Sequence, residues 1–425
     1  MINNNQQIKL EKMSFPQTVN VLRVLMFLLL SLYVLNAVGN LEAIQHWVGG
    51  RRYLNALWIV MVLYLLVSRF DMDRSFFVRQ VRLLAPIGAV CIFLYFYHDR
   101  SFDLGFLKYA VLLVLAASAV CRLNWLDRNV FFRVNSVACL MIFAAAMYQI
   151  IGLHRLVPDG DINQNIFAPQ AMIIGGISVF ACLYDEVDKK ERLLHVVCGM
   201  LALWVALRTS CRTAYVSEIA MAILFCYFAY RKYHWSLLPF VCAILIFVAV
   251  LVMVVLFSPS IVESKFDRIL EEVNGFVALQ PGQSTGTSIG LRLAMWKTAL
   301  MEVVPKNFWF GVGEVSGVDF INLVFHTNVN KKFLFTISHF HNEGINIFVT
   351  GGVLLFWVAN WLLYKLFKRA WNEPVVLGIL VGTFVFGMTE VTWLHKSSFL
   401  TLVSTLLLYE CAVRREFYND ECKIV

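Results

Sequence analysis

The stretch from Ser338 to Leu363, SHFHNEGINIFVTGGVLLFWVANWLL, joins the end of a long polar insert to a run of apolar residues. The apolar part is close to the length of about 20 residues that an α-helix needs to cross a bilayer. The polar part places two histidines, an asparagine and a glutamate immediately before that run. We therefore interpret this stretch as the boundary between the polar insert, which we expect to carry the functional residues, and a membrane-spanning helix.

Outside this stretch the chain is dominated by apolar residues. Of its 425 residues 60% are hydrophobic and 15% are charged, and the mean hydropathy is +0.70. Soluble domains carry about 25% charged residues. Long apolar runs without alternation predict helices, because helices satisfy their own backbone groups in lipid. We expect an all-α polytopic membrane protein with about twelve transmembrane helices, at residues 19–38, 53–68, 82–98, 105–121, 131–152, 166–184, 192–207, 213–230, 236–257, 344–367, 375–393 and 397–413.

The predicted spans divide the chain into three regions. Residues 1–257 hold the first nine spans, residues 258–343 form the polar insert, and residues 344–425 hold the last three spans and a tail. Within the insert, Glu263 to Leu279 and Leu291 to Val304 carry apolar residues at helical spacing. We expect both segments to be amphipathic helices that lie at the membrane surface within one large loop.

The distribution of Lys and Arg predicts the orientation. With the N-terminus inside, nineteen of these residues lie in the inner segments and seven in the short outer loops. Because positive residues accumulate in cytoplasmic loops, both termini are expected in the cytoplasm. The insert and the turn that contains Arg208 and Arg212 then face the opposite, periplasmic side together.

Charge and cysteine content exclude other classes of protein. The net charge of +8 comes from basic residues that flank apolar runs, so no nucleic-acid surface is expected. No cleavable signal peptide is evident at the first apolar run. The ten cysteines form neither a zinc pattern nor an evident disulfide framework. We expect them to be small buried hydrophobic residues.

Three arginines are candidates for binding an anionic group. Arg208 and Arg212 are four residues apart, so they share a helix face if the helix continues past Leu207. Guanidinium groups at a water boundary can bind a phosphate or diphosphate in a bidentate manner. The alternative is that both arginines extend to lipid headgroups. Arg292 stands among apolar residues, and it either forms a local salt bridge or reaches into a site.

The histidines are candidates for acid–base chemistry. His341 can act as a general base near neutral pH if a neighbour fixes its proton position. His339 could share the site, Asn342 could bind substrate, and Glu390 could orient a histidine or pair with an arginine. A buried structural histidine and an H-x-H zinc site are the alternatives, although a zinc site needs a third ligand. We expect no metal and no cofactor.

Together these pieces resemble the O-antigen ligase family of bacterial inner membranes, which is related to the O-antigen polymerases. The resemblance runs from about Asn165 to Ser398 and depends on four motifs. They are LRTSCRTA at 207–214, TSIGLRLAMW at 287–296, HFHNE at 339–343 with Gly351-Gly352, and GMTE at 387–390. The first 160 residues show no such motif.

The resemblance implies a function and a role for each residue. Family members transfer O-antigen polysaccharide from undecaprenyl diphosphate to the lipid A-core oligosaccharide at the periplasmic face, without metal or nucleotide. Arg212 and Arg292 would hold the donor diphosphate, with Arg208 nearby. His341 would take the place of the catalytic histidine, with His339 and Asn342 close to the substrate. Glu390 falls where family members often carry Asp, so this sequence departs from the pattern there.

Other functions remain open at the level of sequence. A polymerase of the same group would join repeat units that are both linked to undecaprenyl diphosphate. A ligase that attaches polysaccharide to protein is a third enzymatic possibility. A transporter or flippase of polysaccharide lipids would also suit twelve helices, but transporters favour charges near the midplane and internal repeats. In this chain the polar candidates gather toward one face.

The predicted orientation can be tested by cysteine labelling. We expect a membrane-impermeant thiol reagent to label Ser284→Cys in intact spheroplasts above the level of the parent chain, because the insert faces outward. Asn372→Cys, between two predicted spans on the cytoplasmic side, is the control and should react only after permeabilisation. The reverse pattern would contradict the orientation and the site that depends on it.

Overall fold

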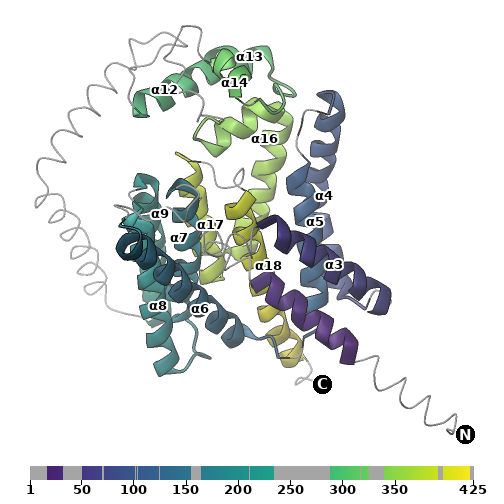
Figure 1. The fold of residues 1–425 in the computed structure, drawn as a ribbon, viewed down its shortest axis with the longest axis vertical. Helices are drawn as coiled ribbons and strands as arrows, with labels where there is room; N and C mark the ends of the chain where they lie inside the picture. Colours follow the sequence, from purple (N-terminus) through teal and green to yellow (C-terminus); the bar gives the residue numbers. More distant parts are fainter. Residues whose placement is uncertain are drawn as a thin grey trace, which may run out of the picture.

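The structure, a computed structural model, forms helices and turns throughout its described residues (Figure 1). These are residues 17–31, 50–68, 71–100, 102, 104–123, 125–154, 164–209, 211–233, 288–315, 317–324, 339–390 and 396–421. The all-helical class expected from the apolar runs is therefore confirmed for this part of the chain.

Among the described residues, four helices are long and apolar enough to cross a membrane. They are α4 (Arg74–Tyr97), α6 with the π-helix η2 (Arg128–Met147 and Tyr148–Gly152), α9 (Arg212–Tyr233) and α16 (Glu343–Ala370). Shorter apolar helices are Gln17–Ser31, most of α3 (Gly50–Ser68), α5 (Gly105–Val120), α7 (Gln164–Ala181) and α17 (Pro374–Gly387). Every predicted span with described residues overlaps a helix. The span at 236–257 lies outside the described residues.

Helix α7 lies at the centre of the bundle and contacts α6, α8 (Lys189–Arg208), α9, α17 and α18 (Lys396–Glu421). Its backbone approaches that of α8 closely at Gly175 and Gly199. A Cβ atom added at Gly199 would lie 2.7 Å from the carbonyl oxygen of Gly175. Small residues let helices approach in lipid, where packing rather than water exclusion drives association.

Buried polar side chains also join α6, α7 and α8. Asn135 donates to the carbonyl oxygen of Ile174 at 2.7 Å and to the hydroxyl of Ser178 at 2.7 Å. Ser136 lies 2.7 Å from Nδ1 of the fully buried His195. A buried polar group is costly unless it is hydrogen-bonded, so these contacts specify how the three helices meet. His195 is therefore a structural histidine.

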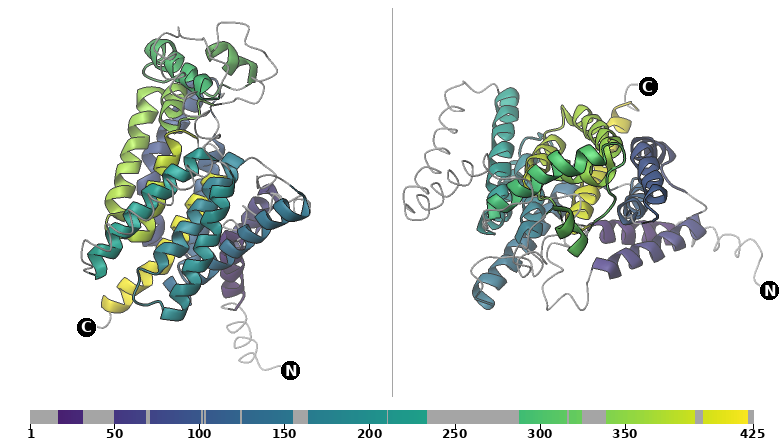
Figure 2. Two further views of the ribbon diagram at one scale, coloured as in Figure 1. Left: turned by 90° about the vertical axis from the view of Figure 1, so that its left-hand side faces the viewer. Right: turned by 90° about the horizontal axis from the view of Figure 1, so that it is seen from above.

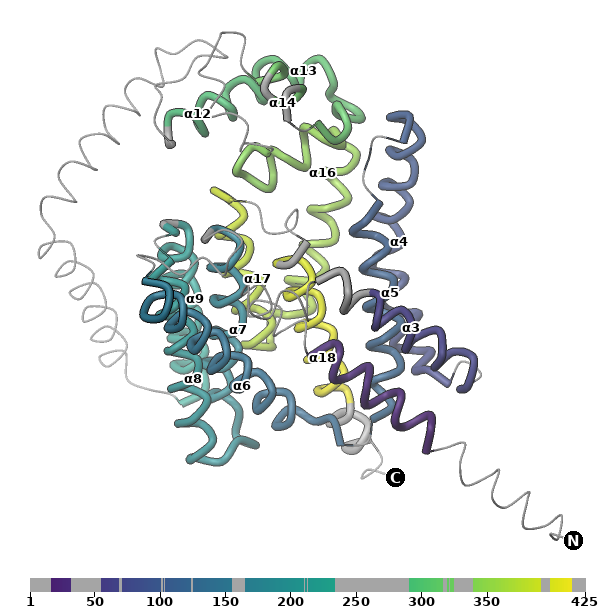
Figure 3. The backbone as a smooth tube through the Cα atoms, viewed as in Figure 1, coloured from purple at the N-terminus to yellow at the C-terminus, as the bar shows by residue number. Residues whose placement is uncertain are grey.

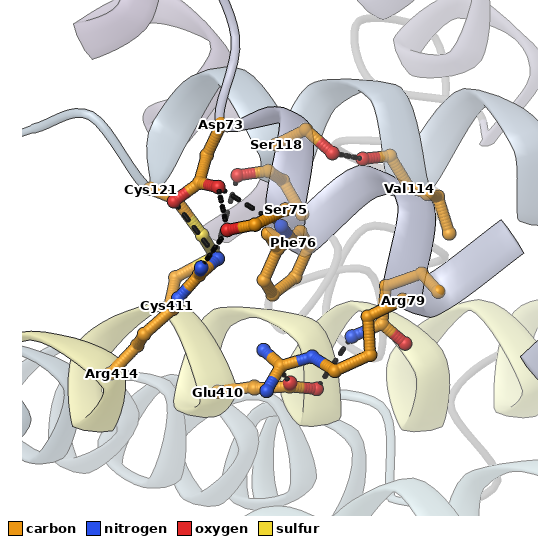
Figure 4. The surroundings of a disulfide bond; sticks show 12 residues. Asp73, Ser75, Phe76, Arg79, Val114, Ser118, Cys121, Glu410, Cys411 and Arg414 are labelled. Carbon is orange, nitrogen blue, oxygen red and sulfur yellow. Dashed lines mark hydrogen bonds and ion pairs between the residues drawn. A yellow bond between two sulfur atoms is a disulfide. The ribbon is translucent and has the colours of Figure 1, made fainter. Parts of the chain in front are cut away.

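The expectation that every cysteine is a plain buried residue is wrong for one pair. Cys121 at the end of α5 and Cys411 in α18 form a disulfide, with Cα atoms 4.8 Å apart (Figure 4). The two residues are 290 positions apart in the chain, so no spacing rule could pair them. Nearby, Arg414 pairs with Asp73 at 2.9 Å and Arg79 with Glu410 at 2.5 Å. Disulfide and ion pairs together join α4, α5 and α18.

The described part of the insert forms α12 (Ser288–Thr298), the π-helix η3 (Ala299–Val303), α13 (Val304–Lys306) and α14 (Gly317–Val324). The helix predicted at 291–304 is thus present, with a wider turn at η3. The helix predicted at 263–279 lies outside the described residues. Segments α12 to α14 lie at the opposite end of the molecule from the C-terminal end of α18 (Figure 1) and over the end of the bundle (Figure 2).

Helix α16 is interrupted at Gly352, and residues of the insert form hydrogen bonds with the backbone at the interruption. Gly352 has φ +65° and ψ −166°, so the helix turns there, as the tube in Figure 3 shows. The turn after α13 supplies the missing hydrogen bonds. Val312 N–H donates to Val349 O at 2.9 Å, and Val353 N–H donates to Phe308 O at 2.8 Å. Backbone groups left unpaired in lipid cost several kcal/mol each, so this docking permits the break.

The break predicts a strict requirement for glycine. A Cβ atom at Gly352 would lie 2.4 Å from the backbone of Trp309 and Phe310, and its positive φ disfavours any other residue. We expect Gly352→Ala to lower the stability by about 1–3 kcal/mol or more, measured as the melting temperature in detergent. Gly344→Ala on the same helix is the control, because its nearest neighbour would be 3.4 Å away. Equal melting temperatures for the two variants would refute the role of the break.

Candidate functional site

Three elements meet at one buried carboxylate. Glu390 follows the end of α17, and its side chain is 2% exposed. Oε1 accepts from Asn165 Nδ2 at 3.1 Å and pairs with the guanidinium of Arg292, and Oε2 lies 2.9 Å from Nδ1 of His341. The three partners come from α7, α12 and the segment that precedes α16. The sequence predicted an arginine or a histidine near Glu390, and the structure places both there, Arg292 and His341.

Arg292 is held by two acceptors on the same turn. Besides Glu390, it donates from Nη1 to the carbonyl oxygen of Thr389 at 2.9 Å. Its side chain is 23% exposed. These bonds use one N–H on each terminal nitrogen, whereas a guanidinium has five N–H donors. Arg292 can therefore keep its ion pair and still offer N–H groups to an anion.

The two other candidate arginines are placed differently. Arg212 is the first residue of α9, and its neighbour Thr213 shares a hydrogen bond of 2.7 Å between hydroxyls with Thr389. The start of α9 therefore borders the site. Arg208 ends α8, and its guanidinium carbon lies 6.0 Å from the ring centroid of Trp204. The described contact of Arg208 is thus with its own helix and not with Glu390.

The two histidines flank a buried phenylalanine that anchors their segment. Phe340 is 2% exposed, and its ring centroid lies 4.9 Å from that of Phe320 in α14. Its carbonyl oxygen accepts from the indole N–H of Trp296 at 2.7 Å. Because Phe340 points into the insert, His339 and His341 lie on the other side, with ring centroids 4.4 Å apart.

His341 and Asn342 form the entry into α16. His341 has φ +49°, a conformation that costs a residue other than glycine some free energy and is common at functional sites. Asn342 caps the helix, since its Oδ1 accepts from Ile345 N–H at 2.9 Å, and its Nδ2 donates to Met388 O at 2.6 Å. Both atoms of the Asn342 amide are thus used to hold the segment next to Glu390.

The contacts of Glu390 determine which nitrogen of His341 carries the proton. A carboxylate accepts hydrogen bonds only, so the imidazole must donate from Nδ1 to Oε2. In the neutral ring the lone pair then lies on Nε2, which can accept a proton from a substrate. The same carboxylate stabilises the cation that forms when Nε2 is protonated. The arrangement suits a general base.

The same residues meet the distance requirement of a metal site. Ligand atoms of His339, His341 and Glu390 lie within 4.8 Å of one another. However, Glu390 also carries Arg292 and Asn165 on its other oxygen. A divalent cation would lie beside the Arg292 guanidinium and would be repelled by it. The set therefore fits a hydrogen-bonded base better than a metal centre.

Sequence reasoning missed two residues that complete the site. Asn165 follows Gln164 at the start of an apolar run, and this polar pair was the available signal. Thr389 contributes its carbonyl oxygen to Arg292 and its hydroxyl to Thr213. Its carbonyl carries no sequence signal, because every residue has one.

Part of the chain that forms this site matches a known protein family. Residues 197–360 match the family model for O-antigen ligase. The match spans α8 through the first part of α16, and so includes Arg208, Arg212, Arg292, His339 and His341. It confirms the resemblance found in the sequence and supports an activity of the O-antigen ligase or polymerase type. No curated protein matches the chain.

The shared carboxylate predicts the effect of changing Glu390. An amide at this position cannot accept from Arg292, Asn165 and His341 together, so one of them loses its partner. We expect Glu390→Gln to reduce polysaccharide transfer roughly 100-fold or more, as wrong tautomers do elsewhere. Glu390→Asp keeps the charge but shortens the reach, and should cost roughly tenfold.

The readout is transfer by membranes that contain equal amounts of each variant. Asp319→Asn is the control, since Asp319 is an exposed acid of α14. Full activity of Glu390→Gln would mean that the carboxylate only joins helices, and it would contradict the proposed tautomer.

Proposed function

We propose, from the O-antigen ligase domain at residues 197–360, that the protein transfers O-antigen polysaccharide from undecaprenyl diphosphate to the lipid A-core oligosaccharide. The observation that carries this proposal is that one buried carboxylate, Glu390, holds a cation and a base side by side. We place the reaction at the periplasmic face of the bacterial inner membrane. The described helices of the insert, α12 to α14, lie at one end of a set of helices apolar enough to span a membrane, which supports that placement.

On the donor side, the chemistry requires positive charge. When the bond between the anomeric carbon and the diphosphate oxygen breaks, negative charge develops on the leaving group. Arg292, fixed by Glu390 and Thr389, would neutralise this charge without having to reorganise. Arg212, at the start of α9, would provide a second guanidinium. Arg208 ends the preceding helix α8, so the two arginines do not share the face of one continuous helix.

On the acceptor side, the chemistry requires a base. The attacking sugar hydroxyl loses its proton to Nε2 of His341 while its oxygen bonds to the anomeric carbon. The proton remains on the imidazole, whose Nδ1–H is held by Glu390. The departing diphosphate takes the electron pair of the broken bond. A single displacement of this kind inverts the anomeric carbon and forms no covalent glycosyl-enzyme.

The other candidate residues fit supporting roles. His339, whose ring lies beside that of His341 at an angle of 49°, would shape the acceptor side. Asn342, whose amide is used within the protein, would position His341 rather than bind substrate through that amide. This scheme requires no metal or other cofactor.

A polymerase that joins undecaprenyl-linked repeat units could use the same groups, and lipopolysaccharide gels distinguish the two reactions. A strain without the gene should lose the whole O-antigen ladder and accumulate undecaprenyl-linked polymer if the protein is a ligase. Persistence of core with one repeat unit would mean a polymerase. If the protein is a transporter, the strain without the gene should instead accumulate the polymer on the cytoplasmic side.

Complementation of the same strain tests the role of His341. We expect His341→Ala and His341→Gln to restore no ladder, although both proteins insert and bind donor, because neither has a base at the position of Nε2. His339→Ala should be milder. Purified wild-type protein should keep its activity in EDTA. A normal ladder with His341→Ala, loss of activity in EDTA that zinc restores, or retention of the anomeric configuration would each refute the mechanism.

A further inference from the structure

A groove of about 310 Å³ runs between α16 and α17 and begins beside the site. Its upper end is formed by Asn342, Glu343 and Met388. Asn342 follows His341 in sequence, and Met388 precedes Thr389, whose carbonyl oxygen binds Arg292. The groove therefore begins next to residues that hold the candidate site.

The walls of the groove suit a hydrocarbon chain. Below the polar end its lining is mostly apolar, with Ile347, Phe356, Ala359, Leu363 and Phe384. Two polar residues, Asn360 and Thr383, also line it, and the side chain of each donates to a backbone carbonyl of its own helix. Gly344 and Gly387 also line it, so no side chain fills the space at their positions. Phe384 and Met388 are 47% and 54% exposed, so the groove is open at the side of the bundle. A polar end above apolar walls matches an amphiphile whose chain enters from the membrane.

We propose that this groove holds the first isoprenyl units of the prenyl diphosphate donor. The inference rests on the proposed function. The donor chain is bonded directly to the reacting diphosphate, so its first units must lie close to Arg292. The acyl chains of the acceptor lipid are separated from the reacting hydroxyl by the core oligosaccharide. The position of the groove, next to the residues that hold Arg292 and His341, therefore favours the donor.

The groove contributes orientation more than affinity. A prenyl chain that enters from the bilayer leaves lipid and not water, so its transfer brings little hydrophobic free energy. Its packing against α16 and α17 instead fixes the direction from which the diphosphate reaches Arg292. Fixing reacting groups in this way raises the rate of the chemical step. Donors with short chains should lack this advantage.

The test uses the full-length protein in detergent and compares two alanine variants. Ala359→Leu places a larger side chain in the groove, whereas Ala89→Leu adds the same atoms to an exposed position on α4. We expect Ala359→Leu to lower kcat/KM for an undecaprenyl donor roughly tenfold, and to leave unchanged both the KM of the acceptor and kcat/KM for a donor whose diphosphate carries a methyl group in place of the prenyl chain. Ala89→Leu should match wild type.

Two outcomes of this comparison would overturn the proposal. A higher acceptor KM with unchanged donor kinetics would assign the groove to an acyl chain of the acceptor. Equal loss with the undecaprenyl donor and the methyl donor would show a general distortion of the site. Because the variant can fail for reasons of folding, cross-linking of the wild-type protein provides a second measurement.

The probe is undecaprenyl diphosphate that carries a photoreactive group on its first isoprenyl unit. We expect cross-links to peptides that contain residues 356–363 or 383–388, and competition by unmodified undecaprenyl diphosphate but not by lipid A. Cross-links confined to α9 or α12 would overturn the proposal. If the probe labels the groove and the wild-type protein transfers no sugar from a glycosylated donor, the proposed function fails while the chain-binding site stands.

Discussion

The site depends on the contacts of one side chain, the carboxylate of Glu390. A carboxylate that is 2% exposed would be strongly destabilising without partners. Its partners come from parts of the chain far apart in sequence, since Asn165 is 225 residues away and Arg292 is 98 residues away. Removal of one partner of a buried charge typically costs about 3–5 kcal/mol. The insert therefore stays attached to the bundle at the same point where the reacting groups must meet.

The broken helix α16 is a second constraint, and it depends on the turn that follows α13. The turn at 308–313 gives the break its hydrogen bonds, and Gly311 and Gly352 allow the two backbones to approach. Because the part of α16 before the break carries the cap residue Asn342, the direction of that part determines where His341 lies. The insert thus has two contacts that affect the position of His341. One is the ion pair of Arg292 with Glu390, and the other is the turn that packs against Gly352.

The sequence predicted the features that follow from local composition. Apolar runs identified the helices, because length and hydropathy are local properties. Arg292, His341 and Glu390 were recognisable because charged residues in or beside apolar runs need partners and are usually functional. The Cys121–Cys411 bond, the break at Gly352 and the contact of Asn165 with Glu390 were not predictable in this way. Each depends on which distant segments pack together, and a single sequence does not encode that in its spacing.

Sharing one carboxylate between a base and a cation has a chemical consequence. In the proposed reaction the imidazole of His341 would gain a positive charge, while the diphosphate beside Arg292 would gain a negative one. Glu390 contacts the imidazole through Oε2 and the guanidinium through Oε1. Without substrate the carboxylate neutralises Arg292. Once the imidazolium formed, it would share the same negative charge, so Arg292 would be less fully neutralised and would attract the leaving diphosphate more strongly. In this proposal, proton removal and departure of the diphosphate are coupled through a single side chain, as a concerted displacement by the protein's own groups requires.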